Sequence, residues 1–268
     1  MWNGCRSVCS AKLKRHNWEG YMMNNLIFDL GFHFGEDTDF YLAKGFDVVA
    51  VEANPYLIDN GRKKYSTEIK NGKLTLLHNA ISSAAGKESF YIHPNKTEWS
   101  SCLKEMAESD GSSAEKVSVD AVNILQLTEE YGVPYYMKVD VEGCDVIVAS
   151  QLSSLNKKPL YVSFETSKKD YADIFSYLHA SGYDEFQLVN QINNEFRPMP
   201  EASMEGNSID YKFGTYSSGF FGKDLPGDRW LTYDEALTQY IKYKELKKID
   251  NKELGLGWLD VHARRPHS

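Results

Sequence analysis

Cysteine is scarce in this chain of 268 residues, and no long apolar run is present. Four cysteines, Cys5, Cys9, Cys102 and Cys144, are too few for the disulfide framework of a small secreted protein. No apolar run approaches the roughly 20 residues that span a bilayer. The first 25 residues also lack the apolar stretch of a signal peptide. We therefore expect a cytoplasmic protein without a membrane partner.

Zinc-type ligand spacing and a basic stripe are also missing. Cys5, Cys9 and His16 lie close in sequence, but they match no common zinc pattern and a fourth ligand is absent. The formal net charge is -8, and no extended basic stripe offsets it; residues 12–16 form one short basic patch near the N-terminus. Nucleic-acid binding surfaces are strongly basic. The sequence thus predicts no metal site and no nucleic-acid partner.

Short apolar runs alternate with amphipathic stretches from residue 25 to residue 190. The predicted strands are 26–30, 48–52, 74–78, 117–119, 135–140, 160–165 and 186–189. The predicted helices are 37–44, a helix opened by Pro55, 121–131 and 171–180, and, beyond this stretch, 232–248, where Thr232 and Glu235 have the positions of a capping box. Strands that alternate with helices favour a parallel sheet covered on both faces. The expected class is α/β, with a doubly wound, mostly parallel, Rossmann-like sheet.

Three parts of the chain differ in pattern. We expect an N-terminal lead-in, a Rossmann-like core and a C-terminal extension, at residues 1–24, 25–190 and 191–268. Within the extension, 191–230 is rich in Gly, Pro, Ser and Asn and carries seven aromatic residues that our predictions single out: Phe196, Tyr211, Phe213, Tyr216, Phe220, Phe221 and Trp230. A long irregular segment of this kind is usually functional. It is expected to cover the C-terminal edge of the sheet and shape an acceptor pocket. The alternative is that it only docks onto the outer helices.

A glycine-containing turn follows the first predicted strand. Gly31 and Gly35 lie where the chain must bend sharply and let a ligand approach the backbone, which a residue without Cβ permits. Glu52 ends the second predicted strand, 21 residues after Gly31 (52 minus 31). A carboxylate at this place suits the two ribose hydroxyls of an adenosine ligand. A strand–helix turn without any ligand is the alternative.

Between two adenosine cofactor classes, the turn favours S-adenosylmethionine. A dinucleotide site has the pattern G-x-G-x-x-G, which presents a helix N-terminus to a pyrophosphate. Here three residues, 32–34, separate the two glycines, and the acids Glu36 and Asp37 follow. Negative side chains at a helix start repel a pyrophosphate but tolerate a sulfonium ligand. A nicotinamide-dependent oxidoreductase is therefore the second choice.

A charged cluster marks the end of the strand predicted at 135–140. Lys138, Asp140 and Glu142 alternate, so their side chains are expected on one face. Burying three charges without partners is costly, and open α/β sheets bind ligands at the C-terminal ends of strands. These three residues are the predicted catalytic group, in which Asp140 or Glu142 takes a proton from a hydroxyl. A metal bound by these acids is the less favoured way to acidify that hydroxyl. Glu165 could join them. The alternative is a structural ion-pair network around Lys138.

Two blocks of sequence carry a family resemblance. Residues 27–55, from Ile-Phe-Asp-Leu-Gly through Val-Glu-Ala-Asn-Pro, and residues 134–143, with Lys-Val-Asp-Val-Glu-Gly, resemble the motifs of FkbM-type S-adenosylmethionine-dependent methyltransferases. The second block is similar to the K-x-D-x-E-G signature of that family. The resemblance covers roughly residues 25–190, and 217–222 is similar to one branch. It implies a methyltransferase of the class I fold.

The resemblance also implies roles for single residues. Gly31 and Gly35 would line the amino-acid end of S-adenosylmethionine, and Glu52 would hold its ribose. The remaining cofactor-binding residues implied are Asp29, His33, Thr38, Ala53, and, flanking the adenine, Asn79 and Ala80. The expected reaction is O-methylation of a hydroxyl on a small molecule or glycan. A non-catalytic cofactor-binding scaffold remains a third alternative, and the sequence leaves the oligomeric state open.

Overall fold

The structure is a computed structural model that describes residues 25–166, 169–249, 252–253 and 257–266. The expected lead-in 1–24, with Cys5, Cys9, His16 and the basic patch, lies outside the described residues. None of the described helices combines the length and the apolar character that a membrane span requires.

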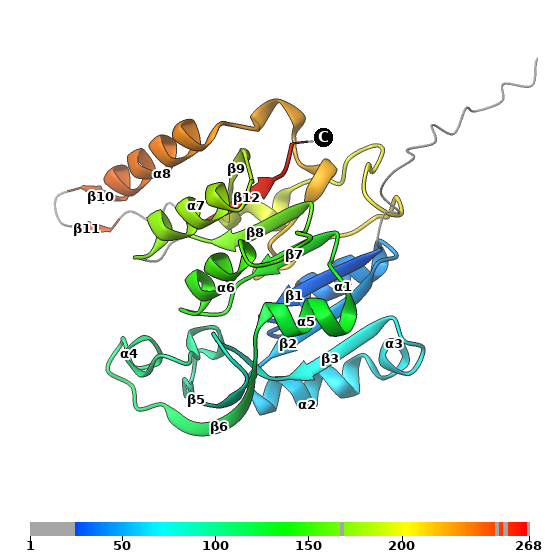
Figure 1. Ribbon diagram of the computed structural model, residues 1–268, viewed down its shortest axis with the longest axis vertical. Helices are drawn as coiled ribbons and strands as arrows, with labels where there is room; N and C mark the ends of the chain where they lie inside the picture. The colour runs from blue at the N-terminus through cyan, green and yellow to red at the C-terminus, as the bar shows by residue number, and fades with distance from the viewer. Residues whose placement is uncertain (1–24, 167–168, 250–251, 254–256, 267–268) are drawn as a thin grey trace, which may run out of the picture.

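A seven-stranded sheet with the order β3-β2-β1-β7-β8-β12-β9 forms the centre of the molecule (Figure 1). Its strands are β1 Leu26–Leu30, β2 Asp47–Glu52, β3 Leu74–His78, β7 Tyr136–Val139, β8 Tyr161–Glu165, β9 Glu185–Asn190 and β12 Leu259–Arg264. The neighbours from β3 to β8 pair in parallel, and β12 pairs antiparallel with both β8 and β9. The prediction of a mostly parallel, doubly wound α/β sheet is confirmed.

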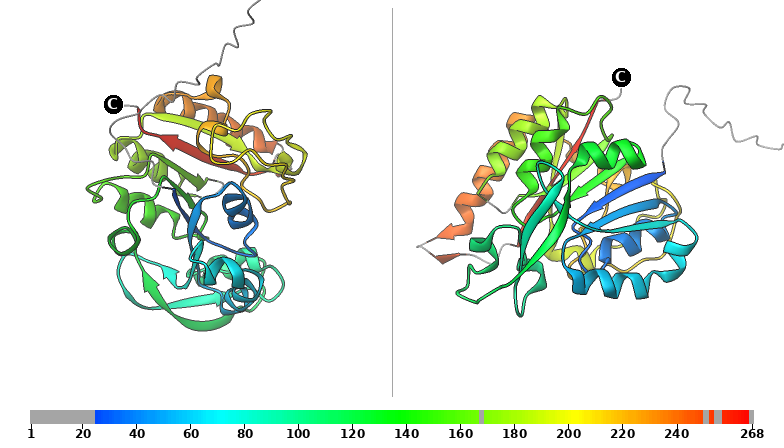
Figure 2. Two further views of the ribbon diagram at one scale, coloured as in Figure 1. Left: turned by 90° about the vertical axis from the view of Figure 1, so that its right-hand side faces the viewer. Right: turned by 60° about the horizontal axis from the view of Figure 1, so that its bottom comes forward.

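Helices cover both faces of this sheet (Figure 2). One face packs against α5 Ile124–Tyr131, α6 Asp145–Leu152, α7 Tyr171–Ala180 and α8 Tyr233–Lys247. The other packs against α1 Glu36–Ala43 and α2 Pro55–Lys64, with the short α3 Ser66–Lys70 following α2. Both faces of β1 and β2 are therefore buried, which is why these strands read as nearly continuous apolar runs.

The helix starts follow local capping chemistry. Asn54 accepts a hydrogen bond from the Tyr56 N–H at 3.0 Å and places Pro55 at the first helical position of α2. A capping box between Asn123 and Gln126 starts α5. The helix thus begins at residue 124 rather than at the expected 121, because residues up to 122 continue a strand. The helix α6 was not predicted from the sequence.

A second, three-stranded sheet lies beside the C-terminal ends of β2 and β3 (Figure 1). It has the order β4-β6-β5, with β4 Ala80–Ile81, β5 Gly86–Ile92 and β6 Glu115–Val122. The connection from β5 to β6 contains the 3-10 helix η1 Thr97–Trp99 and α4 Lys104–Ala107. The sequence predicted only a short strand at 117–119 here. The Ser101 hydroxyl donates to the Glu142 carbonyl at 2.5 Å and ties this connection to the end of β7.

The C-terminal extension takes part in the central sheet. β12 lies between β8 and β9, a pairing that the sequence did not predict. The boundary expected at residue 190 therefore does not coincide with the edge of the sheet. The strand is short and its partners are distant in sequence, so no local pattern reveals the pairing. A two-stranded ribbon, β10 Lys248–Ile249 and β11 Lys252–Glu253, precedes it.

The segment 191–230 packs largely onto α1, which is the alternative that the sequence left open for it. It contains the 3-10 helices η2 Gln191–Phe196, η3 Gly222–Asp224 and η4 Gly227–Arg229. Phe213 and Phe221 are buried against α1, where the rings of Phe213 and Phe40 lie 4.8 Å apart. A buried ion pair joins Lys44 to Asp224 at 2.7 Å. Most of its aromatics thus dock onto a helix, as the alternative stated.

Candidate active site

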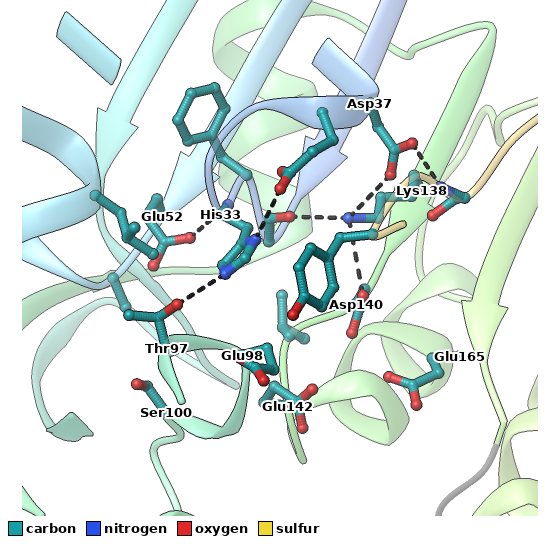
Figure 3. Close-up of a pocket in the computed structure, with 18 of the residues that line it drawn as sticks. His33, Asp37, Glu52, Thr97, Glu98, Ser100, Lys138, Asp140, Glu142 and Glu165 are labelled. Atoms are coloured by element: carbon teal, nitrogen blue, oxygen red, sulfur yellow. Dashed lines mark hydrogen bonds and ion pairs between the residues drawn. The ribbon is translucent and has the colours of Figure 1, made fainter. Parts of the chain in front are cut away.

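A cavity of about 800 Å³ opens at the C-terminal ends of the parallel strands (Figure 3). Gly31 follows β1, Glu52 ends β2, Asn79 follows β3, Asp140 follows β7 and Glu165 ends β8. The chain passes from β1 to β2 on one side, and β7 lies on the other side of β1. Open α/β sheets bind ligands at such a reversal of strand order.

Nine of the residues predicted for the site lie on the cavity wall. They are Gly31, His33, Glu52, Ala53, Asn79, Ala80, Lys138, Asp140 and Glu142. The segment 191–230 also reaches this wall through residues 191–192 and 216–218. Of its seven aromatics, Tyr216 is the one that lines the cavity.

Glu52 is held in place by backbone donors. Its carboxylate accepts the N–H of His33 at 2.9 Å and the N–H of Asn54 at 2.8 Å, one on each oxygen. Burial raises the pKa of Glu52 above its usual range, while these two hydrogen bonds favour the charged form. A carboxylate has about four lone-pair positions. Two acceptor positions therefore remain for a pair of hydroxyl donors.

Backbone strain is concentrated on the cavity wall. Among the described residues other than glycine, His33 (φ 53°) and Glu142 (φ 45°) are the two with positive φ. The His33 ring is fixed by Thr97, whose Oγ1 lies 2.9 Å from Nε2, and by Glu36, 3.3 Å from Nδ1. Strained residues of this kind cluster at functional sites. The sequence gave no signal for Thr97, which comes from η1.

Gly31 is required by a close approach within the protein itself. Its φ is 93°, and a Cβ at this position would lie 1.9 Å from the carbonyl oxygen of Asp140. Any side chain would push the end of β1 away from the end of β7. From the sequence, this glycine was expected to let a ligand approach the backbone. The structure adds a second reason for a glycine here: only a residue without Cβ lets the backbone of Asp140 lie against the end of β1.

Asp29, Gly35 and Thr38 lie behind the cavity wall rather than on it. Asp29 is fully buried and accepts a hydrogen bond from the Thr38 hydroxyl at 2.6 Å. A Cβ on Gly35 would lie 2.4 Å from the Tyr65 hydroxyl oxygen, so this glycine packs against protein. These three residues support the turn after β1. The structure does not bring them to the cavity as the resemblance implied.

Lys138 is the centre of a buried ion-pair network. Its Nζ donates to the Gly31 carbonyl at 2.9 Å and lies 3.5 Å from Asp29, 3.6 Å from Asp37 and 4.0 Å from Asp140. Burial alone lowers the pKa of Lys138, but the surrounding carboxylates raise it well above the usual value. Burial raises the pKa of Asp29 to about 6. The ion-pair network that was the structural alternative for Lys138 is thus present in the fold.

Acidic side chains gather at the other end of the cavity. One carboxylate oxygen each from Asp140, Glu142 and Glu165 lies within 4.8 Å of the other two. Asp260 on β12 lines the same cavity and is 6% exposed. Burial, followed by the charges of Asp140 and Glu165, raises the pKa of Asp260 well above its ordinary value. Asp260 was not predicted as a site residue, because no local pattern in the sequence indicates the strand β12.

Apolar side chains form the wall next to Glu52. Ala53, Leu57, Ala80 and Phe90 are all buried and line the cavity there. Leu57 comes from α2 and Phe90 from β5, and neither was predicted as a site residue. Helical spacing would have identified Leu57 as a buried residue only. Phe90 gave no signal, since the small sheet was not predicted.

Two solved structures resemble the chain weakly. A precorrin-6y C5,15-methyltransferase from Geobacter metallireducens has a TM-score of 0.39 and 9% identity, over 90% of this chain and 80% of its own. Phosphoethanolamine N-methyltransferase 2 from Haemonchus contortus, solved with S-adenosyl-L-methionine, has a TM-score of 0.32 and 10% identity. The match covers 93% of this chain and 50% of that protein's chain. Among curated proteins, none matches the chain in sequence.

A family match covers most of the Rossmann-like core. The sequence profile described as Methyltransferase FkbM domain matches residues 29–185, which is more than half of the chain. The matched stretch contains the turn after β1, Glu52 at the end of β2, and the Lys138–Glu142 segment after β7. The resemblance read from the two sequence blocks is therefore confirmed, and the chain belongs to the FkbM methyltransferase family.

Proposed function

We propose that this protein transfers a methyl group from S-adenosylmethionine to a hydroxyl on a small molecule or glycan. One observation carries the proposal: a single cavity holds Glu52 at one end and the carboxylates of Asp140, Glu142 and Glu165 at the other (Figure 3). The first end offers acceptors to a ribose. The second places negative charge where a proton must be removed.

The cofactor would lie over the ends of β1, β2 and β3. The two remaining acceptor positions of Glu52 match the two ribose hydroxyls. The buried apolar wall formed by Ala53, Leu57, Ala80 and Phe90 suits an adenine ring. The amino-acid end would then lie near Gly31 and His33, which direct the sulfonium toward Asp140.

Methyl transfer is a displacement at carbon. The acceptor oxygen forms the new O–CH₃ bond while the C–S bond breaks and its electrons return to sulfur. The hydroxyl proton passes to Asp140 or Glu142, directly or through water, which contributes roughly 10²–10⁴-fold to the rate. Holding oxygen, methyl carbon and sulfur in line supplies much of the remaining acceleration.

The acidic wall disfavours a nicotinamide dinucleotide. Glu36 and Asp37 start α1, and both line the cavity. Asp37 is buried, and its carboxylate accepts the Ser218 N–H at 2.7 Å, so it cannot turn away from a pyrophosphate. The same negative charge attracts a sulfonium and makes nucleic acid an unsuitable partner.

Calorimetry on Glu52→Ala tests the proposal. Each lost charge-assisted hydrogen bond is worth about 1.5–3 kcal/mol, so S-adenosylmethionine should bind roughly one to two decades more weakly. Glu129→Ala, an exposed glutamate on α5, is the control and should bind like the wild type. Formation of S-adenosylhomocysteine with sugar and phenol acceptors then tests the transfer itself. Unchanged cofactor affinity in Glu52→Ala would refute the assignment.

A further inference from the structure

Three carboxylates at the acceptor end have the spacing of cation ligands. Asp140 and Glu142 follow β7, Glu165 ends β8, and one oxygen from each lies within 4.8 Å of the other two. Oxygens that share a hard divalent cation with bonds of about 2.0–2.6 Å lie up to about 4–5 Å apart. The three side chains can therefore meet one ion with little movement.

A fourth carboxylate, from another strand, lines the cavity beside these three. Asp260 and Glu165 are directly opposite in the antiparallel pairing of β12 with β8, so their side chains share a face. Asp260 is 6% exposed and lines the cavity. In the described part of the chain, no hydrogen bond or ion pair reaches its carboxylate; the charges of Asp140 and Glu165 raise its pKa, and the more weakly acting charge of Lys138 lowers it. A buried carboxylate normally has a partner.

The charge of the cavity wall also favours a cation. Its described acidic residues are Glu36, Asp37, Glu52, Glu98, Asp140, Glu142, Glu165 and Asp260. Lys138 is the one lysine or arginine among the described lining residues, and it also contacts Asp29 and Asp37. Ligands that are all carboxylates suit hard ions such as Mg²⁺, Mn²⁺ and Ca²⁺.

We propose that Asp140, Glu142 and Glu165, with Asp260 beside them, bind one hard divalent cation that takes the acceptor hydroxyl as a further ligand. The role in catalysis rests on the proposed methyl transfer, whereas the ion site itself does not. A cation lowers the pKa of a bound hydroxyl. The O–H proton then leaves to cavity water, the oxygen lone pair forms the O–CH₃ bond, and the C–S electron pair returns to sulfur. Asp140 would act as a ligand rather than as the base.

Mn²⁺ binding to the full-length protein tests the site without any activity assay. Titration followed by electron paramagnetic resonance should show one tight site in the wild type, from which Mg²⁺ or Ca²⁺ displaces Mn²⁺. Glu165→Gln and Asp260→Asn should each weaken Mn²⁺ binding by roughly ten-fold or more. Glu142→Gln is a second ligand variant at a less buried position, and it should weaken binding similarly even if Asp260→Asn fails to fold.

Glu52→Gln is the matched control, because it removes the same charge from the same cavity at the cofactor end. It should weaken S-adenosylmethionine and leave Mn²⁺ affinity unchanged. Wild-type protein that binds the cofactor but no Mn²⁺ would overturn the cation site alone. Folded Glu165→Gln and Glu142→Gln that bind Mn²⁺ like the wild type would overturn it as well. Mn²⁺ binding without cofactor binding would instead contradict the proposed function and leave the ion site standing.

Discussion

The two ends of the cavity are built in opposite ways. At the cofactor end, two backbone N–H groups fix the carboxylate of Glu52. One belongs to His33 in the turn after β1, and the other to Asn54, just after β2. At the acceptor end, Asp140, Glu165 and other acids come together from the ends of different strands. The first end is preorganised before a ligand arrives. The second concentrates like charges, which a bound cation or shared protons would stabilise.

Asp140→Asn should produce the largest effect and sharpen this contrast. It keeps the shape of the side chain and removes its charge, so turnover should fall by roughly 10²–10⁴-fold whether Asp140 accepts the proton or binds a cation. The rate of S-adenosylhomocysteine formation at saturating cofactor measures it. Cofactor affinity should change little. A parallel loss of affinity would mean that the two ends are not separate.

Lys138→Met should act on stability. The ammonium lies 3.5 Å from Asp29 and 3.6 Å from Asp37, and both carboxylates are buried. Removing one partner of a buried ion pair costs about 3–5 kcal/mol, which urea denaturation measures as the free energy of unfolding. Lys157→Met, an exposed lysine, is the control. A stable Lys138→Met protein that has lost turnover would place this lysine in the chemistry instead.

The buried Asp29, which lies behind the cofactor end of the cavity, predicts that the free energy of unfolding depends on pH. Burial raises its folded pKa to about 6 from an ordinary 3.8. The folded state therefore keeps a proton that the unfolded chain has released between these values. The stabilisation is fully present below about pH 3.8 and is lost as pH rises through about 6, by up to about 3 kcal/mol. In Asp29→Asn, the unfolding free energy should lack this fall. Equal slopes in both proteins would contradict the assignment.

Tyr216→Ala should have the smallest effect and confine it to the acceptor. The ring is 55% exposed on the cavity wall, 5.7 Å from the His33 ring. Losing an aromatic contact of about 0.5–1.5 kcal/mol should raise KM for the acceptor by roughly two- to ten-fold. Phe196→Ala, 76% exposed in the same segment and away from the wall, is the control. Identical KM values for the two variants would show that Tyr216 does not contact the acceptor.

The sequence predicted the parts of the site that depend on neighbouring residues. The strands at 26–30 and 48–52 are nearly continuous apolar runs, so their existence and the place of Glu52 at a strand end followed directly. The capping residues Thr232 and Glu235 predicted the start of α8 for the same reason, and their mutual hydrogen bonds are present. A short stretch of sequence is enough to predict such features, because the residues that form them are close together in the chain.

The acceptor end depended on contacts that no local pattern contains. β12 pairs with β8 and β9 across a long separation in sequence, so Asp260 could not be placed beside Glu165. The β5–β6 region reads as a polar loop, although it supplies Phe90 and Thr97 to the cavity. Lys138 looked catalytic from its spacing, with an ion-pair network as the alternative, and its distances to Asp29 and Asp37 identify the buried partners of that network.

Calorimetric titration of S-adenosylmethionine into wild type, Glu52→Ala and Asp140→Asn tests most directly whether the two ends have separate tasks. We predict measurable binding to the wild type, affinity lower by roughly one to two decades in Glu52→Ala, and nearly unchanged affinity in Asp140→Asn. The opposite pattern, with affinity retained by Glu52→Ala and lost by Asp140→Asn, would contradict the assignment of the cofactor to the β2 end of the cavity.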